Sequence, residues 1–405
     1  MGHDGVTGHC RDCMPACWAV KAIVDVASGT VHGVTKPKDL AIVGLGIVGA
    51  SVAYAAARAG ARIVALDAGV PGEGTSGTSF AWLNAARKEP EVYHRLNADG
   101  MAAHRELARD LGGDTGHHEG GSLEWAEGDE QERELRARVE RLARRGYAAE
   151  WISRERVRAM EPALAVGDHV REVAFYAAES WLDAPRLIRA LLGAASARGA
   201  TIRERAPVRS LRARGRRVEA LVVGDGEVIA GSLVICVGPS TQAFVAPLGV
   251  GVPVGRVPGL LAVTSPPAQP LRRVVHAPGV HLRPDAGGGL VLGAEDVDAP
   301  AAQAPSPSRL DELAALLLER AAHVVPAARG VKVVDRRVGV RPMPADRHTI
   351  AGRLPGFDNV WVIATHSGVT LGPLLGRLIT DEIVGGAPHP ALAPFRPERF
   401  AATLV

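Results

Sequence analysis

Three glycines in the segment Gly44-Leu-Gly-Ile-Val-Gly49 have the G-x-G-x-x-G spacing of a phosphate-binding turn. Gly44 permits a tight turn, Gly46 lets the backbone approach a pyrophosphate, and Gly49 lets a helix pack closely on a strand. A helix that begins here would direct the free N–H groups of Ile47 and Val48 toward the phosphates. The pattern therefore predicts a dinucleotide site.

An acidic residue stands at the spacing that such a site requires. Asp67 follows Gly49 by 18 residues and ends an apolar run. Its carboxylate, with Ala68 beside it, would accept hydrogen bonds from the ribose hydroxyls. An acid here argues against the 2′-phosphate of NADP, but it does not separate NAD from FAD.

The segment 72–79, Gly-Glu-Gly-Thr-Ser-Gly-Thr-Ser, favours FAD. An NAD-binding domain needs only a short connection at this point, whereas FAD has a second half to be covered. The N–H and hydroxyl groups of Gly74, Thr75, Ser76 and Ser79 suit the pyrophosphate and the ribityl chain. The alternative interpretation is a flexible surface loop.

The elements expected around these residues form a βαβ unit. Residues 40–43 and 62–66 are short apolar runs, typical of strands that are buried on both faces of a sheet. Between them, residues 47–59 carry small and apolar residues at helical spacing, and Gly60 follows as a helix stop.

The rest of the chain is less regular. Asp183-Ala-Pro is a helix start, with Asp183 as the N-cap and proline in the first turn. Residues 257–264, 279–283 and 290–294 are expected to be strands of a second sheet. Residues 299–308 are rich in Pro, Ala and Ser, which predicts a linker.

Length and composition indicate a globular protein of two domains. The chain has 405 residues, of which 47% are hydrophobic and 22% charged, and a net charge of +3. That charge is too small to indicate nucleic-acid binding. We expect no integral membrane segment, because no apolar run approaches the roughly 18 residues of a membrane span. The N-terminus lacks the order of a signal peptide, so a cytoplasmic location is expected.

Three of the four cysteines lie in a polar leader, at Cys10, Cys13 and Cys17. A C-x2-C pair with a third cysteine could bind zinc, but no second pair of ligands matches it. We therefore expect no metal site and a disordered N-terminal extension over residues 1–37. Cys236 lies in an apolar run and is expected in the core.

Two later segments resemble the D-amino-acid oxidase superfamily of FAD-dependent oxidoreductases, which includes glycine oxidase and sarcosine oxidase. Residues 338–352, with Arg341-Pro near their start, resemble the G-[LV]-R-P run of that family. Residues 359–373 resemble its closing strand and helix start beside the flavin. With the glycine motif and residues 74–79 and 230–238, the resemblance covers about residues 40–395 in family order.

The resemblance implies an α/β fold of two interleaved domains. A Rossmann-like FAD-binding domain would be assembled from residues 38–115, 183–250 and 338–395. Residues 116–182 and 251–337 would form a mostly antiparallel α+β substrate domain.

The resemblance also implies oxidation of a C–N bond. In this family the C–H bond beside the substrate nitrogen gives a hydride to flavin N5, and the resulting imine is hydrolysed. The expected substrate is a small amine or amino acid, namely a D-amino acid, glycine or an N-methyl amino acid. Oxygen or another electron acceptor would reoxidise the flavin, and a homo-oligomer is left open.

Several residues receive roles from the resemblance. Arg341 would bind the substrate carboxylate through its planar fork, the alternative being a structural arginine bonded to backbone. His281 falls where glycine-oxidase-like members carry a substrate-facing tyrosine, and the alternative is a histidine packed in the sheet. Trp82 and Asn84 would lie near the isoalloxazine or pack at a domain interface. The remaining residues expected to contact FAD are Val208, Gly238, His366, Ser367, Gly368, Val369 and Thr370.

Two departures from the family pattern limit what is carried over. Glycine-oxidase-like proteins carry an arginine in the closing loop, and none follows His366 here, so glycine is not assigned as the substrate. The sarcosine-oxidase type attaches its flavin through a cysteine near the R-P position. Residues 335–344 contain no cysteine, so we expect non-covalent FAD.

Two rival functions stay open. One is an NAD-dependent dehydrogenase of a small acid, for which no clear catalytic His or Lys follows the first βαβ unit. The other is a non-catalytic flavoprotein component of a hetero-oligomeric dehydrogenase, against which the glycine motif and Arg341 argue.

Overall fold

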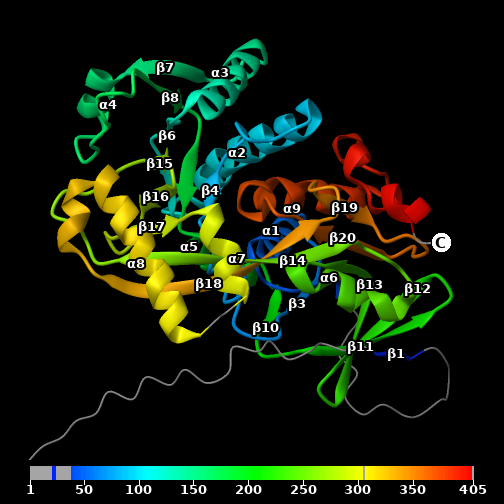
Figure 1. Ribbon diagram of the computed structural model, residues 1–405. Coiled ribbons are helices and arrows are strands. Elements are labelled where there is room, and N and C mark those ends of the chain that lie inside the picture. The colour runs from blue at the N-terminus through cyan, green and yellow to red at the C-terminus, as the bar shows by residue number, and fades with distance from the viewer. Residues whose placement is uncertain (1–20, 24–37, 304–305, 404–405) are drawn as a thin grey trace, which may run out of the picture.

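The computed structural model describes residues 21–23, 38–303 and 306–403, so the cysteine leader lies outside the described residues. Two β-sheets form the body of the molecule, with the antiparallel strands β15 to β17 on the left of Figure 1 and strands β11 to β13 and β20 on the right. Of residues 1–37, residues 21–23 form strand β1, which pairs in parallel with β11.

The first sheet has a parallel centre, in the order β10-β3-β2-β13-β20, with antiparallel strands beyond it. Its described strands are β1 (Lys21–Ile23), β2 (Lys38–Val43), β3 (Ile63–Leu66), β10 (Thr201–Arg203), β11 (Val208–Arg214), β12 (Arg217–Val223), β13 (Gly226–Ile235), β19 (Ile350–Arg353) and β20 (Val360–Ala364).

Both faces of this sheet are covered, as the apolar runs predict. Ile42 and Ala65 point to one face and join a core with the helices α1, α2, α5 and α9. Ala41 and Val64 point to the other face and pack with β11, β12 and the C-terminal segments. The helices of the described chain are α1 (Ile47–Arg58), α2 (Glu91–Leu111), α3 (Asp129–Arg144), α4 (Arg154–Met160), α5 (Ala184–Ser196), α6 (Thr241–Val245), α7 (Glu295–Gln303), α8 (Pro307–Val324) and α9 (Gly368–Gly385).

The second sheet is antiparallel except where β15 pairs with β6, and α8 covers one of its faces. Its order is β18-β14-β17-β16-β15-β6-β8-β7. These strands are β6 (Ser122–Glu124), β7 (Ala149–Ser153), β8 (Glu172–Tyr176), β14 (Val254–Thr264), β15 (Val274–Ala277), β16 (Val280–Pro284), β17 (Leu290–Gly293) and β18 (Val333–Pro344).

The described chain also forms a small third sheet. It contains β4 (Trp82–Leu83), β9 (Ser180–Leu182) and β5 (His117–Glu119) in that order. Asp183, directly after β9, caps α5 as expected, since its carboxylate accepts a hydrogen bond from Arg186 N at 3.2 Å.

The expectation of a linker over residues 299–308 is wrong. Helix α7 continues to Gln303 with Pro300 inside it. Val297 and Ala301 are buried against the antiparallel sheet, so tertiary packing outweighs the low helix propensity of this composition.

Otherwise the mixed architecture confirms the expected α/β fold with a largely antiparallel second sheet. The domain boundaries given above stay a prediction. No described helix has the length and apolarity that crossing a bilayer demands.

Gly49 fixes the distance between α1 and the turn that precedes it. A Cβ atom built on Gly49 would lie 1.8 Å from the carbonyl oxygen of Gly44, which is a backbone atom and cannot rotate away. Gly44 in turn has φ +90° and faces the carbonyl of Cys236 at the end of the sheet. Helix and sheet therefore meet at a backbone-to-backbone contact.

We predict that Gly49→Ala lowers the free energy of unfolding by about 1–3 kcal/mol or more, because the added methyl must move backbone. Gly193→Ala is the matched control. Gly193 lies in helix α5 with no atom within 4 Å of its Cβ position, so this change should be neutral or stabilising by up to about 1 kcal/mol. Denaturant unfolding of the cofactor-free proteins measures both, and equal stability of the two variants would contradict the packing argument.

Candidate functional site

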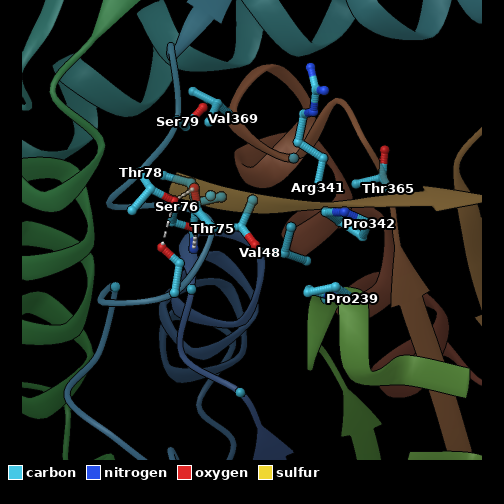
Figure 2. Close-up of a pocket in the computed structure, with 18 of the residues that line it drawn as sticks. Val48, Thr75, Ser76, Thr78, Ser79, Pro239, Arg341, Pro342, Thr365 and Val369 are labelled. Carbon is cyan, nitrogen blue, oxygen red and sulfur yellow. Dashed lines mark hydrogen bonds between the residues drawn. The ribbon is translucent and has the colours of Figure 1, made fainter. Parts of the chain in front are cut away.

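A cavity of about 830 Å³ lies between the two large sheets. Segments that are distant in the sequence line it: the turn after β2, residues 66–82, the end of β13, strand β18 and the start of α9. Figure 2 shows Thr75, Ser76 and Thr78 on the side of the cavity next to α1, and Arg341, Pro342 and Thr365 on the opposite side.

The N-terminus of α1 opens into this cavity. Gly46 precedes the helix without a side-chain cap, and the first turn of the helix contains no acidic residue. The only side chain of the described part that accepts from Ile47 N is Ser76, whose Oγ lies at 3.0 Å. The positive end of the helix dipole is therefore not neutralised by a carboxylate and can attract an anion. Because Gly44 and Gly46 have no Cβ, Cys236 O and Ser76 Oγ can approach the turn closely.

Asp67 lies at the carboxyl end of β3 and fixes the shape of the glycine turn. Its Oδ2 accepts a hydrogen bond from Leu45 N at 2.6 Å, and its Oδ1 accepts one from Gly69 N at 2.9 Å. A carboxylate has about four acceptor positions, so two stay available for hydroxyl groups of a ligand.

The loop over residues 72–79 is held against helix α1 and against the second sheet. Ser76 contacts the N-terminus of α1, and Thr75 Oγ1 donates to the carbonyl oxygen of Val340 on β18 at 2.5 Å. These contacts favour the interpretation of this loop as a cover of the cavity over that of a flexible surface loop.

The cavity brings together nearly every residue that the sequence singled out. Gly49 is the exception, because it packs under the turn and does not face the space. The residues that line it are Gly44, Gly46, Ile47, Val48, Asp67, Ala68, Gly74, Thr75, Ser76, Ser79, Trp82, Asn84, Val208, Gly238, His281, Arg341, His366, Ser367, Gly368, Val369 and Thr370.

Arg341 reaches the cavity from β18 but is not unpaired. Its Nη2 lies 2.5 Å from Asp298 Oδ2 and donates to the carbonyl oxygen of Pro258 at 2.9 Å. Asp298, on α7, also accepts from Leu260 N at 3.0 Å. Burial raises the pKa of Asp298, and Arg341 opposes that rise. The charges of Asp298 and Arg341 nearly cancel each other. The N–H groups on Nη1 of Arg341 stay available to donate to another partner.

His281 faces the cavity from β16 as a neutral group. Burial lowers its pKa to about 3, with smaller contributions from Arg87 and Arg341. The edge of its ring packs on Phe80, with the ring centroids 4.8 Å apart. At neutral pH it therefore offers a polar but uncharged surface.

The start of α9 forms the opposite wall. Its first turn contains no acidic residue, and Ser367 precedes it. Tyr93 OH lies 2.9 Å from Ser367 Oγ, and Thr365 Oγ1 accepts from Ser367 N at 3.1 Å, so the loop is fixed from two sides. Burial, with smaller contributions from Lys88 and Arg341, lowers the pKa of His366 to about 4.

Sequence reasoning missed two charged residues of the site. Asp298 directly precedes the segment that the composition predicts as a linker, and Lys88 follows the 79–84 run without belonging to any motif. The remaining acidic residues of the lining, Asp67 and Glu73, accept backbone hydrogen bonds. Within the described residues, no cluster of three or more His, Cys, Asp or Glu side chains could hold a metal ion.

A buried carboxylate holds the 82–86 segment in place behind the cavity. Glu179 is 1% exposed and accepts hydrogen bonds from Trp82 Nε1 at 2.9 Å and from Ala86 N at 3.1 Å. Ser122 Oγ at 2.6 Å and Tyr147 OH at 3.1 Å complete its environment. Burial without an ion-pair partner raises the pKa of Glu179 to about 7.

Comparisons with known proteins agree with this geometry. Residues 39–382 match the family model described as DAO, FAD dependent oxidoreductase. The chain is 26% identical over 375 residues to one of the opine oxidase chains of Agrobacterium tumefaciens strain Ach5, covering 90% of this chain and 98% of that protein. It is 27% identical over 371 residues to the glycine oxidase of Geobacillus kaustophilus, covering 88% and 96%.

A solved structure shares the fold over nearly its whole length. The crystal structure of glycine oxidase from Geobacillus kaustophilus matches with a TM-score of 0.78 and 26% identity, covering 89% of this chain and 98% of that one. The fold and the resemblance seen in the sequence are thereby confirmed.

We predict that Glu179→Gln changes the pH dependence of stability. The folded-state pKa of Glu179, about 7, lies above the ordinary value of 4.5. Burial of this carboxyl therefore does not destabilise the native protein through ionisation below pH 4.5, but it destabilises the protein increasingly as the pH rises from 4.5 to 7. The stability of the variant relative to the native protein should therefore rise by up to about 3 kcal/mol between these pH values and stay level above.

Thermal or denaturant unfolding at several pH values measures this difference. Glu119→Gln is the control of opposite sign, because the hydrogen bond from Arg105 lowers the pKa of Glu119, and the stability of that variant relative to the native protein should fall as pH rises. A pH-independent difference for Glu179→Gln would show that Glu179 is not buried as an unpaired carboxyl.

Proposed function

Because the chain belongs to the DAO family of FAD dependent oxidoreductases, we propose that it oxidises the C–N bond of a carboxylated amine. The substrate class is an amino acid or secondary amine, and oxygen or another acceptor takes the electrons. One observation carries the proposal: a single cavity has an uncompensated helix N-terminus at one side and Arg341 at the other.

The residues present fit an FAD molecule. The glycine turn and the N-terminus of α1 would hold the pyrophosphate, and Asp67 would accept from the ribose. The 74–79 loop would cover the middle of the cofactor, and residues 366–370 would contact the ring system. Cys236 is a buried cysteine of this lining; burial raises the pKa of its thiol, which makes it a poor nucleophile for covalent attachment and supports non-covalent FAD.

FAD, when bound there, would supply the electron sink for a two-electron oxidation of the C–N bond. The chain itself orients the substrate. Arg341 would bind the carboxylate through Nη1 while Asp298 and Pro258 hold the guanidinium in place. His281 and His366 stay neutral at physiological pH, so they neither repel an amine nor compete for its proton.

The experiment that tests this function is anaerobic mixing of the flavin-loaded protein with a panel of glycine, D-amino acids and N-methyl amino acids. A substrate bleaches the oxidised flavin band without any acceptor present, so the result does not depend on reactivity with oxygen. Retention of full colour with every amine of the panel would favour the non-catalytic flavoprotein alternative.

We predict that replacing Arg341 by Met raises the KM or Kd for the best carboxylated substrate by about 10- to 100-fold, since a charge-assisted hydrogen bond contributes about 1.5–3 kcal/mol. Asp298→Asn is combined with it, so that no buried carboxylate is left unpaired. Arg337→Met is the matched control, because Arg337 lies on the same strand but pairs with Asp335 and does not line the cavity. An unchanged KM in the double variant would refute the role of Arg341.

A further inference from the structure

We propose that Trp82 limits the size of the substrate that the cavity admits, and that Glu179 positions the indole of Trp82 from outside the cavity. Trp82 would contact the substrate, whereas Glu179 would act only through Trp82. This inference rests on the proposed function, because it concerns which molecules the same cavity accepts.

Trp82 belongs to an aromatic wall of the cavity, which we define as Phe80, Trp82 and His281. The ring of Trp82 packs on that of His276 of β15, with the ring centroids 4.0 Å apart. His276 is the register partner of His281 on the next strand, and the ring of Phe80 lies 4.8 Å from that of His281. The second sheet therefore supports this wall from behind. A ligand bound at Arg341 shares the cavity with FAD, so its substituent would have only the space that the wall leaves free.

The indole of Trp82 is fixed in orientation. Its Nε1 donates to Glu179 Oε2 at 2.9 Å, while His276 packs on the ring. The guanidinium of Arg87 lies 5.5 Å from the ring centroid, and an ion pair with Glu124 at 2.6 Å holds that guanidinium in turn. A side chain that shapes a binding site discriminates between ligands only if its neighbours lock its conformation, and these contacts do so for Trp82.

The contacts of Glu179 require a carboxylate. Its Oε2 accepts from Trp82 Nε1 and Ser122 Oγ, and its Oε1 accepts from Ala86 N and Tyr147 OH. The two hydroxyl groups could rotate and accept instead, but the two N–H groups can only donate. A glutamine would turn its NH2 group toward one of these N–H groups. Either choice would release one end of the segment that carries the indole.

A second pair of a buried tryptophan and a buried glutamate lies outside the cavity. Trp361 Nε1 donates to Glu382 Oε2 at 3.3 Å, and Glu382 also forms an ion pair with Arg396. Neither Trp361 nor Glu382 lines the cavity. Trp361→Phe therefore removes the same kind of N–H group without touching the aromatic wall, which makes it the matched control for Trp82→Phe.

The test measures the binding of acetate and phenylacetate to the flavin-loaded protein by isothermal titration calorimetry. These acids share the carboxylate and differ by one phenyl substituent. Trp82→Phe keeps an aromatic side chain but removes the N–H and part of the ring. It should improve phenylacetate binding relative to acetate at least about tenfold, and Trp361→Phe should leave the ratio of the two Kd values unchanged.

A double-mutant cycle tests the role of Glu179. Glu179→Gln alone should shift the Kd ratio toward phenylacetate by about threefold or more, because the indole loses its fixed acceptor. In the Trp82→Phe background the same change should shift the ratio by less than about twofold, because no indole N–H is left to position. A loss of global stability would not produce this dependence on residue 82.

Three results would overturn the proposal. If acetate binds but Trp82→Phe leaves the Kd ratio unchanged, Trp82 does not limit the substrate, while the proposed function stands. If Glu179→Gln shifts the ratio equally in both backgrounds, Glu179 does not act through Trp82. If neither acid binds the flavin-loaded native protein or its Trp82→Phe variant, the proposed function fails together with this inference.

Discussion

The backbone contact between Gly49 and the carbonyl of Gly44 determines where the chemistry of this protein can occur. It places the start of α1 directly at the carboxyl end of β2, with Cys236 O against Gly44 on the neighbouring strand. Any side chain at Gly44 or Gly49 would push the helix away from the sheet. Because this contact fixes the helix against the sheet, the N–H groups of its first turn, Asp67 and the 72–79 loop all face the same cavity. Strand β18 of the second sheet forms another wall of that cavity.

Desolvation then decides what the charges in this space can do. The fold itself compensates Asp67 by backbone amides and Arg341 by Asp298. Behind the cavity, four hydrogen-bond donors and a raised pKa do the same for Glu179. The neutral histidines His281 and His366 follow the same rule, since burial suppresses their protonation.

The local part of the site could be predicted from the sequence. The glycine spacing, the position of Asp67 and the apolar runs on either side are short-range patterns, and the structure places them as a βαβ unit. Residues around Arg341 and His366 could be placed only through family resemblance, because they approach the glycine turn from segments about 300 residues away in the chain.

The remaining residues could not be predicted, for physical reasons. Asp298 lies in a proline-containing helix that tertiary packing stabilises against its composition. Lys88 belongs to no motif, and its place in the lining of the cavity depends on the folded arrangement. Glu179 belongs to no motif, and its role depends on donors from Trp82, Ala86, Ser122 and Tyr147, which the fold brings together.

The visible absorption spectrum of the purified, desalted protein tests the central claim most directly. A cavity that holds FAD without a covalent bond predicts the two-banded spectrum of oxidised flavin, with the colour passing into the supernatant when the protein is denatured and precipitated. A colourless protein that also fails to take up added FAD would contradict the account.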